Sequence, residues 1–304
     1  MTIQTVLIPT DGSDRSNAAA RRGLDLATAL DCTVHVLSVA DSSIATGAGY
    51  SGDSPSIRQR LREKATERAT ALRDEAIQRG IETTAVAREG IPANEIVTYA
   101  TDEEIDAIVI GTAGRGGVAR AVMGGVADKV VRTASVPVIT ITPKAAGTKR
   151  VEDVNAILLP TDGSETATAV ADRGVELAVQ FTASVHFLSV IDHSRLSALS
   201  EIFDTESAPN DELRERAIDH LDALASDARG RGVDTQISVK GGDPAEEIVQ
   251  YAESEAIDLI ALGTAGRGGF ERLLVGSVAD QVIRTAPVPV LTTRPSTARE
   301  VNID

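Results

Sequence analysis

The chain has 304 residues, enough for two domains of about 150 residues, and its apolar content of 42% is typical of a folded protein. Its formal net charge of −15 disfavours duplex nucleic acid or an anionic membrane as the main partner, because both attract basic surfaces. No apolar run reaches the roughly 18 residues of a membrane span, the first residues lack the basic region of a signal peptide, and one cysteine excludes an intramolecular disulfide. We therefore expect a cytoplasmic protein.

The acidic composition also suggests the kind of environment in which the protein is found. Acidic residues outnumber basic ones by 45 to 30, and most of the basic residues are arginines. At molar salt the Debye length falls to about 3 Å, which screens the self-repulsion of such a surface. The composition favours a halophilic protein, with an ordinary acidic bacterial protein as the alternative.

The first half alternates short β-branched runs with segments of helical periodicity. Ser13 is expected to cap the first helix, Pro55 to open the long second helix and Gly80 to end it. Expected strands cover residues 5–9, 33–39, 82–89, 105–111 and 136–142, and expected helices cover residues 14–30, 55–79, 92–104 and 125–134. This alternation predicts a parallel sheet with helices on both faces.

The same order of elements occurs twice. The segment "PTDGSDRSNAAARRG" from Pro9 is matched by "PTDGSETATAVADRG" from Pro160, about 150 residues later, a period too long for a solenoid. We expect an α/β protein of two tandem doubly wound domains, residues 1–143 and 155–304, joined by a polar linker at residues 144–154. In the second half, Asp243 and Glu246 have the spacing of a helix capping box.

Polar residues follow the expected strands at their carboxyl ends. Thr10 and Asp11 follow the first strand, Asp41 follows the second, and Thr161 and Asp162 repeat the first pair. Open α/β sheets bind ligands beyond these strand ends, where the strand order reverses. The sequence therefore places a candidate site at this end of each domain.

A glycine-rich phrase follows the fourth expected strand and runs directly into a helix, as "GTAGRGGVARAVMGGVAD" from Gly111 and "GTAGRGGFERLLVGSVAD" from Gly263. A helix N-terminus presents unpaired N–H groups and a partial positive charge, which favour phosphate. Glycines let the backbone approach an anion, and an arginine adds a cation. These residues are Gly114, Gly124, Arg115, Gly266, Gly276 and Arg267. The phrase is neither a Walker P-loop nor a dinucleotide fingerprint, so the residues alone predict an anion site, with a loop for tight packing as the alternative.

Each half resembles the universal stress protein family, whose nucleotide-binding members carry the pattern G-x-x-G, nine residues, then G-[ST]. The second half matches this pattern in full with Gly263, Gly266, Gly276 and Ser277. The first half has Gly111, Gly114 and Gly124, followed by Gly125 where the hydroxyl is expected. The openings "IPTDGS" and "LPTDGS" and the closings "VPVIT" and "VPVLT" extend the resemblance over nearly the whole chain.

The resemblance implies that each domain has a five-stranded parallel sheet that binds ATP without a P-loop, with Mg²⁺ on the phosphates. Asp11 or Asp162 would meet the adenosine end, and Val39 or Val190 would contact adenine through the backbone. The same wall would be lined by Pro9, Thr10, Pro160 and Thr161. The glycine loop would wrap the phosphates with Ser277, so we expect the second domain to be the principal site.

Family members usually pair through the last strand. We therefore expect the two domains to pair with each other, with a homodimer and an unidentified protein partner as further expectations.

Several side chains have a simpler interpretation. Asp11 and Asp162 could act only within their turns. No further metal ligands of suitable spacing accompany the two strand histidines, so we expect them in the core or an interface. The remaining expectations are core histidines at His35 and His186, a buried thiol at Cys32, helix caps at Ser13 and Ser164, and a solvated helix face from Ile57 to Arg79.

The leading functional hypothesis is an ATP-binding regulator of a cytoplasmic stress response, with no catalytic and no metal-ligating residues assigned. A slow ATP hydrolase or nucleotide-transferring enzyme is one alternative, for which Asp41, Asp192 and the loop arginines are the candidate groups. An interaction module with two vestigial pockets is the other.

Overall fold

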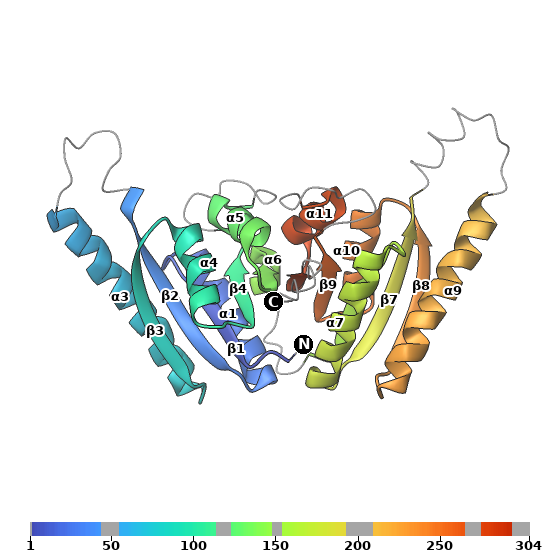
Figure 1. The fold of residues 1–304 in the computed structure, drawn as a ribbon, viewed down its shortest axis with the longest axis horizontal. Coiled ribbons are helices and arrows are strands. Elements are labelled where there is room, and N and C mark those ends of the chain that lie inside the picture. Colours follow the sequence, from blue (N-terminus) through green and yellow to red (C-terminus); the bar gives the residue numbers. More distant parts are fainter. Residues whose placement is uncertain are drawn as a thin grey trace, which may run out of the picture.

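The computed structural model describes residues 2–43, 55–113, 123–147, 154–192, 209–264 and 275–293 (Figure 1). The first half contains β1 (Thr5–Pro9), α1 (Asp14–Leu30), β2 (Thr33–Asp41), α3 (Pro55–Gln78), β3 (Thr83–Gly90), α4 (Pro92–Asp102), β4 (Ala107–Gly111), α5 (Gly125–Thr133), β5 (Val138–Ile141) and α6 (Pro143–Ala146). The second half contains β6 (Ala156–Pro160), α7 (Glu165–Phe181), β7 (Ser184–Ile191), α9 (Pro209–Gly230), β8 (Thr235–Gly241), α10 (Pro244–Ser254), β9 (Leu259–Gly263), α11 (Ser277–Thr285) and β10 (Val290–Thr293).

The strands form one sheet in the order β3-β2-β1-β4-β5-β10-β9-β6-β7-β8. Within each half all neighbouring strands are parallel, as the alternation of elements predicted. The halves meet where β5 and β10 pair antiparallel, with Leu291 opposite Ile139. The two expected five-stranded sheets are therefore joined edge to edge into a single ten-stranded sheet, which confirms the α/β fold class and refines its strand count.

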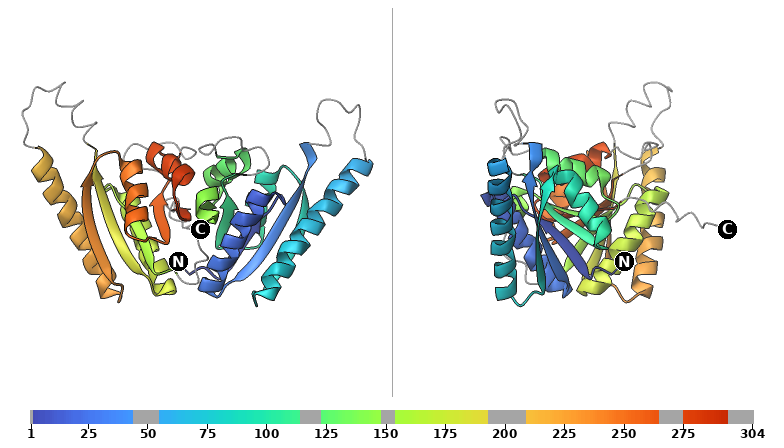
Figure 2. Two further views of the ribbon diagram at one scale, coloured as in Figure 1. Left: turned by 180° about the vertical axis from the view of Figure 1, so that it is seen from behind. Right: turned by 60° about the vertical axis from the view of Figure 1, so that its left-hand side comes forward.

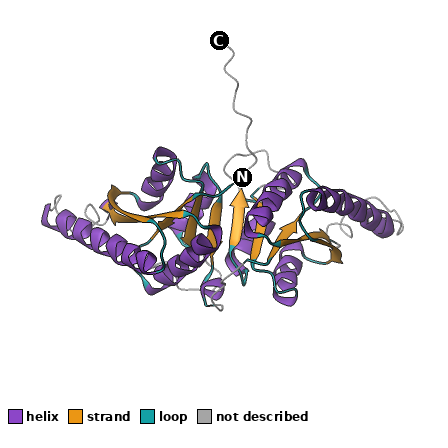
Figure 3. Cartoon of the chain, turned by 90° about the horizontal axis from the view of Figure 1, so that it is seen from below, coloured by secondary structure: helices purple, strands orange, loops and turns teal. Residues whose placement is uncertain are grey.

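Helices cover both faces of the sheet (Figures 2 and 3). Buried residues of α1, α3, α7 and α9 form one hydrophobic cluster with one face of the strands. Buried residues of α4, α5, α10 and α11 form a second cluster with the other face. The central strands are thus buried from both sides, which explains their apolar sequences. The edge strands β3 and β8 contain only half-buried and exposed residues. In the described part of the chain, no helix is long and apolar enough to cross a bilayer.

The helix ends follow from local chemistry. Ser13 accepts a hydrogen bond from the backbone N–H of Ser16, and Ser164 accepts one from Ala167, which confirms both predicted caps. Asp243 caps α10 by accepting from the N–H groups of Ala245 and Glu246. The corresponding residue before α4 is Ile91, whose side chain makes no capping bond. The two otherwise similar halves therefore differ in how this helix begins.

Two glycines inside helices bring α1 and α7 close to the sheet. A Cβ added at Gly23 would lie 2.9 Å from Cγ1 of Val109, and one at Gly174 would collide with the side chain of Leu159. Glycine costs about 1 kcal/mol relative to alanine in a helix, so these positions trade helix propensity for a closer approach of helix and strand.

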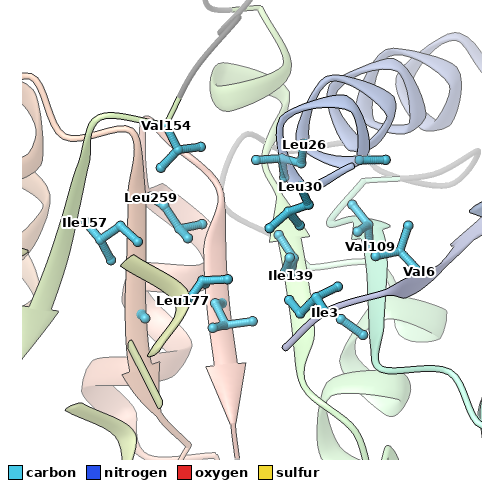
Figure 4. Close-up of a cluster of buried hydrophobic side chains, with 14 of the residues drawn as sticks. Ile3, Val6, Leu26, Leu30, Val109, Ile139, Val154, Ile157, Leu177 and Leu259 are labelled. Atoms are coloured by element: carbon cyan, nitrogen blue, oxygen red, sulfur yellow. The ribbon is translucent and has the colours of Figure 1, made fainter. Parts of the chain in front are cut away.

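The contact between the halves is both apolar and hydrogen-bonded. Figure 4 shows Leu30 and Ile139 of the first half near Leu177 and Leu259 of the second, within one buried cluster. Hydroxyls of three threonines donate to carbonyls across the contact, namely Thr140 to Val290, Thr292 to Val138 and Thr142 to Ala286. The Gln180 side chain likewise accepts from the backbone N–H of Ile3 and donates to its carbonyl. The expected pairing of the two halves is thus an extensive internal contact.

Candidate functional site

The strand order reverses between β1 and β4 in the first half and between β6 and β9 in the second. β1 lies between β2 and β4, while the chain passes from β1 to β2 on one side and returns to β4 on the other. Helices therefore leave the carboxyl ends of neighbouring strands on opposite faces, and we call the region beyond these strand ends, where open α/β sheets bind ligands, the crevice of each half. The buried threonines Thr10 and Thr112 directly follow the two strands of the first crevice, and Thr161 and Thr264 follow those of the second.

The turn after β1 is held by its own side chains. Asp11 Oδ1 accepts from the N–H of Ser13 at 2.9 Å, and the Thr10 hydroxyl accepts from the N–H of Gly12 at 3.1 Å. Gly12 has φ = 75°, which L-residues adopt at a cost. Asp162, Thr161 and Gly163 repeat this arrangement after β6. Each aspartate therefore stabilises its turn, and the turn places its carboxylate beside the crevice.

The end of β2 offers backbone groups to the same crevice. The N–H of Thr10 bonds to the carbonyl of Leu37 at 2.9 Å, and the chain of β1 then turns away. Val39 lies two residues beyond Leu37, so its N–H and C=O point to the same side, past the end of β1. Thr161 and Leu188 make the same bond in the second half, which gives Val190 the same orientation. Pro9 and Pro160 are the last residues of β1 and β6.

The start of α5 is tied directly to the end of β4. The N–H of Gly124 donates to the carbonyl of Thr112 at 2.7 Å, and Gly276 donates to Thr264 at the same distance. Both glycines are helix N-caps without a side-chain capping bond. The first N–H groups of α5 and α11 therefore point at the crevice with a partial positive charge that suits an anion.

Gly125 and Ser277 are the first residues of these two helices, and both are exposed. The preceding caps have nearly the same conformation, with φ −65° and ψ 143° at Gly124 and φ −59° and ψ 150° at Gly276. Among the described residues, a Cβ added at Gly125 would meet no atom within 4 Å. The two helix starts therefore differ by a serine side chain and hardly at all in backbone.

The remaining glycines of the phrase have different positions. Gly111 ends β4, and a Cβ there would lie 2.8 Å from Cβ of Ala19, so this glycine permits close packing of α1. Gly263 ends β9 in the equivalent place. The predicted loop residues Gly114, Arg115, Gly266 and Arg267 lie outside the described residues.

Sequence reasoning missed Thr112 and Thr264 as site residues. Each links β5 or β10 to the helix start, because its N–H bonds to the last strand while its carbonyl holds the N-cap glycine. The only signal was the repeated "GTAG", which does not distinguish a backbone carbonyl that positions a helix from any other.

Other predicted residues have structural surroundings. Cys32 is 7% exposed, and burial raises the pKa of its thiol to about 12. His186 is 6% exposed and its Nδ1 lies 3.1 Å from the Tyr251 hydroxyl, while Nδ1 of His35 lies 2.8 Å from the hydroxyl of Tyr99. Burial confirms a core position for the thiol and for His186, whereas His35 is half-buried.

The helix α3 behaves as predicted for a solvated face. Its buried side chains are Ala65, Ala69, Leu72 and Ala76, while Glu75 pairs with Arg21 and with Arg79. A cavity of about 300 Å³ is lined by residues at the end of α1 and just after α3, which include Asp31, Arg79 and Glu82. This cavity lies at the amino ends of β2 and β3, away from the crevices.

Comparison with known proteins agrees with the duplicated architecture. The model of the universal stress protein family matches residues 2–142 and again residues 154–294. A universal stress protein of Methanocaldococcus jannaschii is 37% identical over 135 residues, covering 44% of this chain and 79% of that protein. A universal stress protein of Mycobacterium tuberculosis is 29% identical over 305 residues, covering 96% of this chain and 97% of that protein.

Solved structures agree at the level of the fold. The crystal structure of a universal stress protein from Archaeoglobus fulgidus superposes with a TM-score of 0.71 at 20% identity and covers 96% of this chain and 97% of that chain. With two matches that together span nearly the whole sequence, this chain belongs to the universal stress protein family as a tandem of two family domains.

Proposed function

We propose that the protein binds an adenine nucleotide, ATP with Mg²⁺, in the crevices of its two halves, and acts as a cytoplasmic stress-response regulator. One observation carries the proposal. In both halves a helix N-terminus without a side-chain cap is tied to the strand end at the point where strand order reverses. This is the place where open α/β sheets bind nucleotides, and the exposed N–H groups suit phosphates.

The other walls fit the rest of the ligand. Asp162 and Asp11 are candidates to accept hydrogen bonds from the ribose or adenine, and the backbone groups of Val190 and Val39 can pair with the adenine edge, as the family resemblance implies. In the described part of the chain, no group of three or more His, Cys, Asp or Glu is placed to hold a metal ion. The proposal has Mg²⁺ bound through phosphate oxygens, which needs no such group.

Binding supplies a route to regulation. Nucleotide contacts would favour one arrangement of the glycine loop and helix start, and so change the surface that a partner protein meets.

The enzyme alternative has Asp41 as one of its candidate groups. Its Oδ1 accepts hydrogen bonds from both the N–H and the hydroxyl of Ser43, so this oxygen already has two donors. A homodimer and the protein partner stay predictions.

The test is calorimetric titration of the intact chain with ATP, ADP and AMP, with and without Mg²⁺. Asp162→Ala is expected to weaken binding by about 1.5–3 kcal/mol. Asp162→Asn is the matched control for folding, because an amide oxygen can still accept the Ser164 N–H that Oδ1 accepts now. Wild-type protein that binds none of the three nucleotides would refute the proposal, and equal affinities in all three proteins would confine Asp162 to its turn.

A further inference from the structure

Four charged residues connect α5 and α11 across the contact between the halves. Within α5, Arg132 Nε bonds to Asp128 Oδ2 at 3.0 Å. Within α11, Arg284 bonds to Asp280 through Nε at 2.8 Å and Nη2 at 2.9 Å. Arg132 Nη2 also approaches Asp280 Oδ1 of the other half at 3.9 Å. These four residues form the α5–α11 charge cluster.

The cluster is partly shielded from solvent, and its charges act on one another. The four side chains are between a quarter and a third exposed. The pKa of Arg132 is raised, first by its hydrogen bond to Asp128 and further by the charges of Asp128 and Asp280. The pKa of Arg284 is raised by its bond to Asp280 and also by the charge of Asp128. Each guanidinium therefore interacts with a carboxylate from the other half.

The two aspartates lie close to the helix starts described above. Asp128 and Asp280 are in the first turns of α5 and α11. Asp280 lies three positions after Ser277, about 4.5 Å along the helix axis. A bare carboxylate at that distance repels a bound polyphosphate, whereas a carboxylate paired with guanidinium does so much less. Asp280 has two guanidinium neighbours, one of which belongs to the first half.

We propose that Arg132 of the first half is a positioning residue for the phosphate site of the second half, acting through Asp280, and that the α5–α11 charge cluster thereby couples the two sites. This inference rests on the proposed nucleotide function. Movement of α5 when a nucleotide binds to the first half displaces Arg132 and changes how far Asp280 is neutralised. Thermodynamic linkage makes this coupling reciprocal.

The test compares Arg132→Gln with the unmodified chain in titrations with ATP and with adenosine. The second-half site is identified as the one that Ser277→Gly weakens. At this site Arg132→Gln should lower ATP affinity about fivefold and leave adenosine affinity unchanged, since only the phosphates are repelled by the Asp280 carboxylate. In an Asp280→Asn background, Arg132→Gln should have no further effect on that site. The ATP effect should shrink at molar KCl, where the Debye length is about 3 Å.

Lys144→Gln is the matched control. Lys144 of α6 pairs with Glu253 of α10, so its loss also removes an ion pair across the contact but leaves α5 and α11 untouched. The inference is overturned by unchanged ATP affinity in Arg132→Gln, by an equal loss in Lys144→Gln, or by a loss that persists with Asp280→Asn. Wild-type protein that binds no nucleotide would instead refute the proposed function, and this inference with it.

Discussion

The difference between Gly125 and Ser277 predicts two unequal nucleotide sites. The N-cap glycines that precede these residues have nearly the same φ and ψ, so both helices can offer the same N–H groups. Only Ser277 adds a hydroxyl that can donate to a phosphate oxygen. A hydrogen bond to a charged group contributes about 1.5–3 kcal/mol, which corresponds to an affinity ratio of about 10- to 150-fold between the halves.

The structure allows the prediction to be tested in both directions. Because a Cβ at Gly125 meets no atom of the described residues within 4 Å, Gly125→Ser should fit there and strengthen the weaker site. Ser277→Gly should weaken the tighter site. Ser277→Ala separates the loss of the hydroxyl from the gain in backbone freedom, since it removes the hydroxyl without introducing glycine.

Calorimetric titration of the four proteins with ATP gives the affinities and the number of tight sites. The expected result is one tight site in the wild type and two similar sites in Gly125→Ser. Two equal sites in the unmodified chain would refute the reasoning, as would a Ser277→Gly variant that binds ATP as tightly as the wild type.

The fold supports four further predictions. Ile91→Asp should raise the free energy of unfolding by about 1 kcal/mol, because Ile91 is 51% exposed and Asp243 caps the equivalent helix. An unchanged midpoint of urea unfolding would contradict this. Gly174→Ala should lower the free energy of unfolding by about 1–3 kcal/mol, because the added methyl group overpacks the contact with the sheet. Gly230→Ala should not lower it, because no atom of the described residues lies within 4 Å of a Cβ there. Burial lowers the pKa of His186, while the charge of Glu255 opposes this shift. The free energy of unfolding should therefore fall as the pH drops below the ordinary histidine pKa of about 6.5. Denaturation at several pH values should show a smaller fall in His186→Gln than in the unmodified chain. If the charge is an adaptation to brine, the melting temperature should rise between about 0.1 M and 2 M KCl, and a flat response would exclude that origin.

Most of the secondary structure could be predicted because local signals agree with the fold. Caps such as Ser13 and apolar strands such as Thr5–Pro9 specify their own conformation. The short helix α6 at the start of the predicted linker was missed, although Thr142 caps it and Pro143 occupies its first turn. Its four residues are too few for a periodic pattern, and its stability depends on burying Ala145 against the fold.

Strand pairing between the halves could not be derived from periodicity. The run Val138–Ile141 is apolar apart from Thr140, which indicates a buried strand but does not identify the neighbouring strand. Its antiparallel pairing with β10 depends on contacts between residues about 150 positions apart, such as the Thr140 hydroxyl bonding to the carbonyl of Val290. Here the family resemblance was informative where the residue pattern was not.

The position of the candidate site in the fold could be predicted from the sequence better than the roles of its individual residues. Strand ends and the helix start were located correctly because they follow from the order of elements. Gly111 illustrates the limit, since a Cβ there would lie 2.8 Å from Cβ of Ala19, so this glycine permits close packing of α1, which its motif did not indicate. Its role in nucleotide binding stays a prediction. Thr112 contributes through a backbone carbonyl, and sequence alone does not indicate where a carbonyl points.

Joining two domains in one chain removes a constraint that a homodimer obeys. In a symmetric pair every substitution appears on both sides of the interface. Here Glu253, which pairs with Lys144 across the contact, corresponds to Thr101 in the first half. The caps of α4 and α10 and the first residues of α5 and α11 have also diverged. Arg132 and Asp128 correspond to Arg284 and Asp280, so the α5–α11 charge cluster is one that identical subunits could also form. The diverged positions, rather than this cluster, are what would let one half specialise in the proposed binding, as Gly125 and Ser277 illustrate.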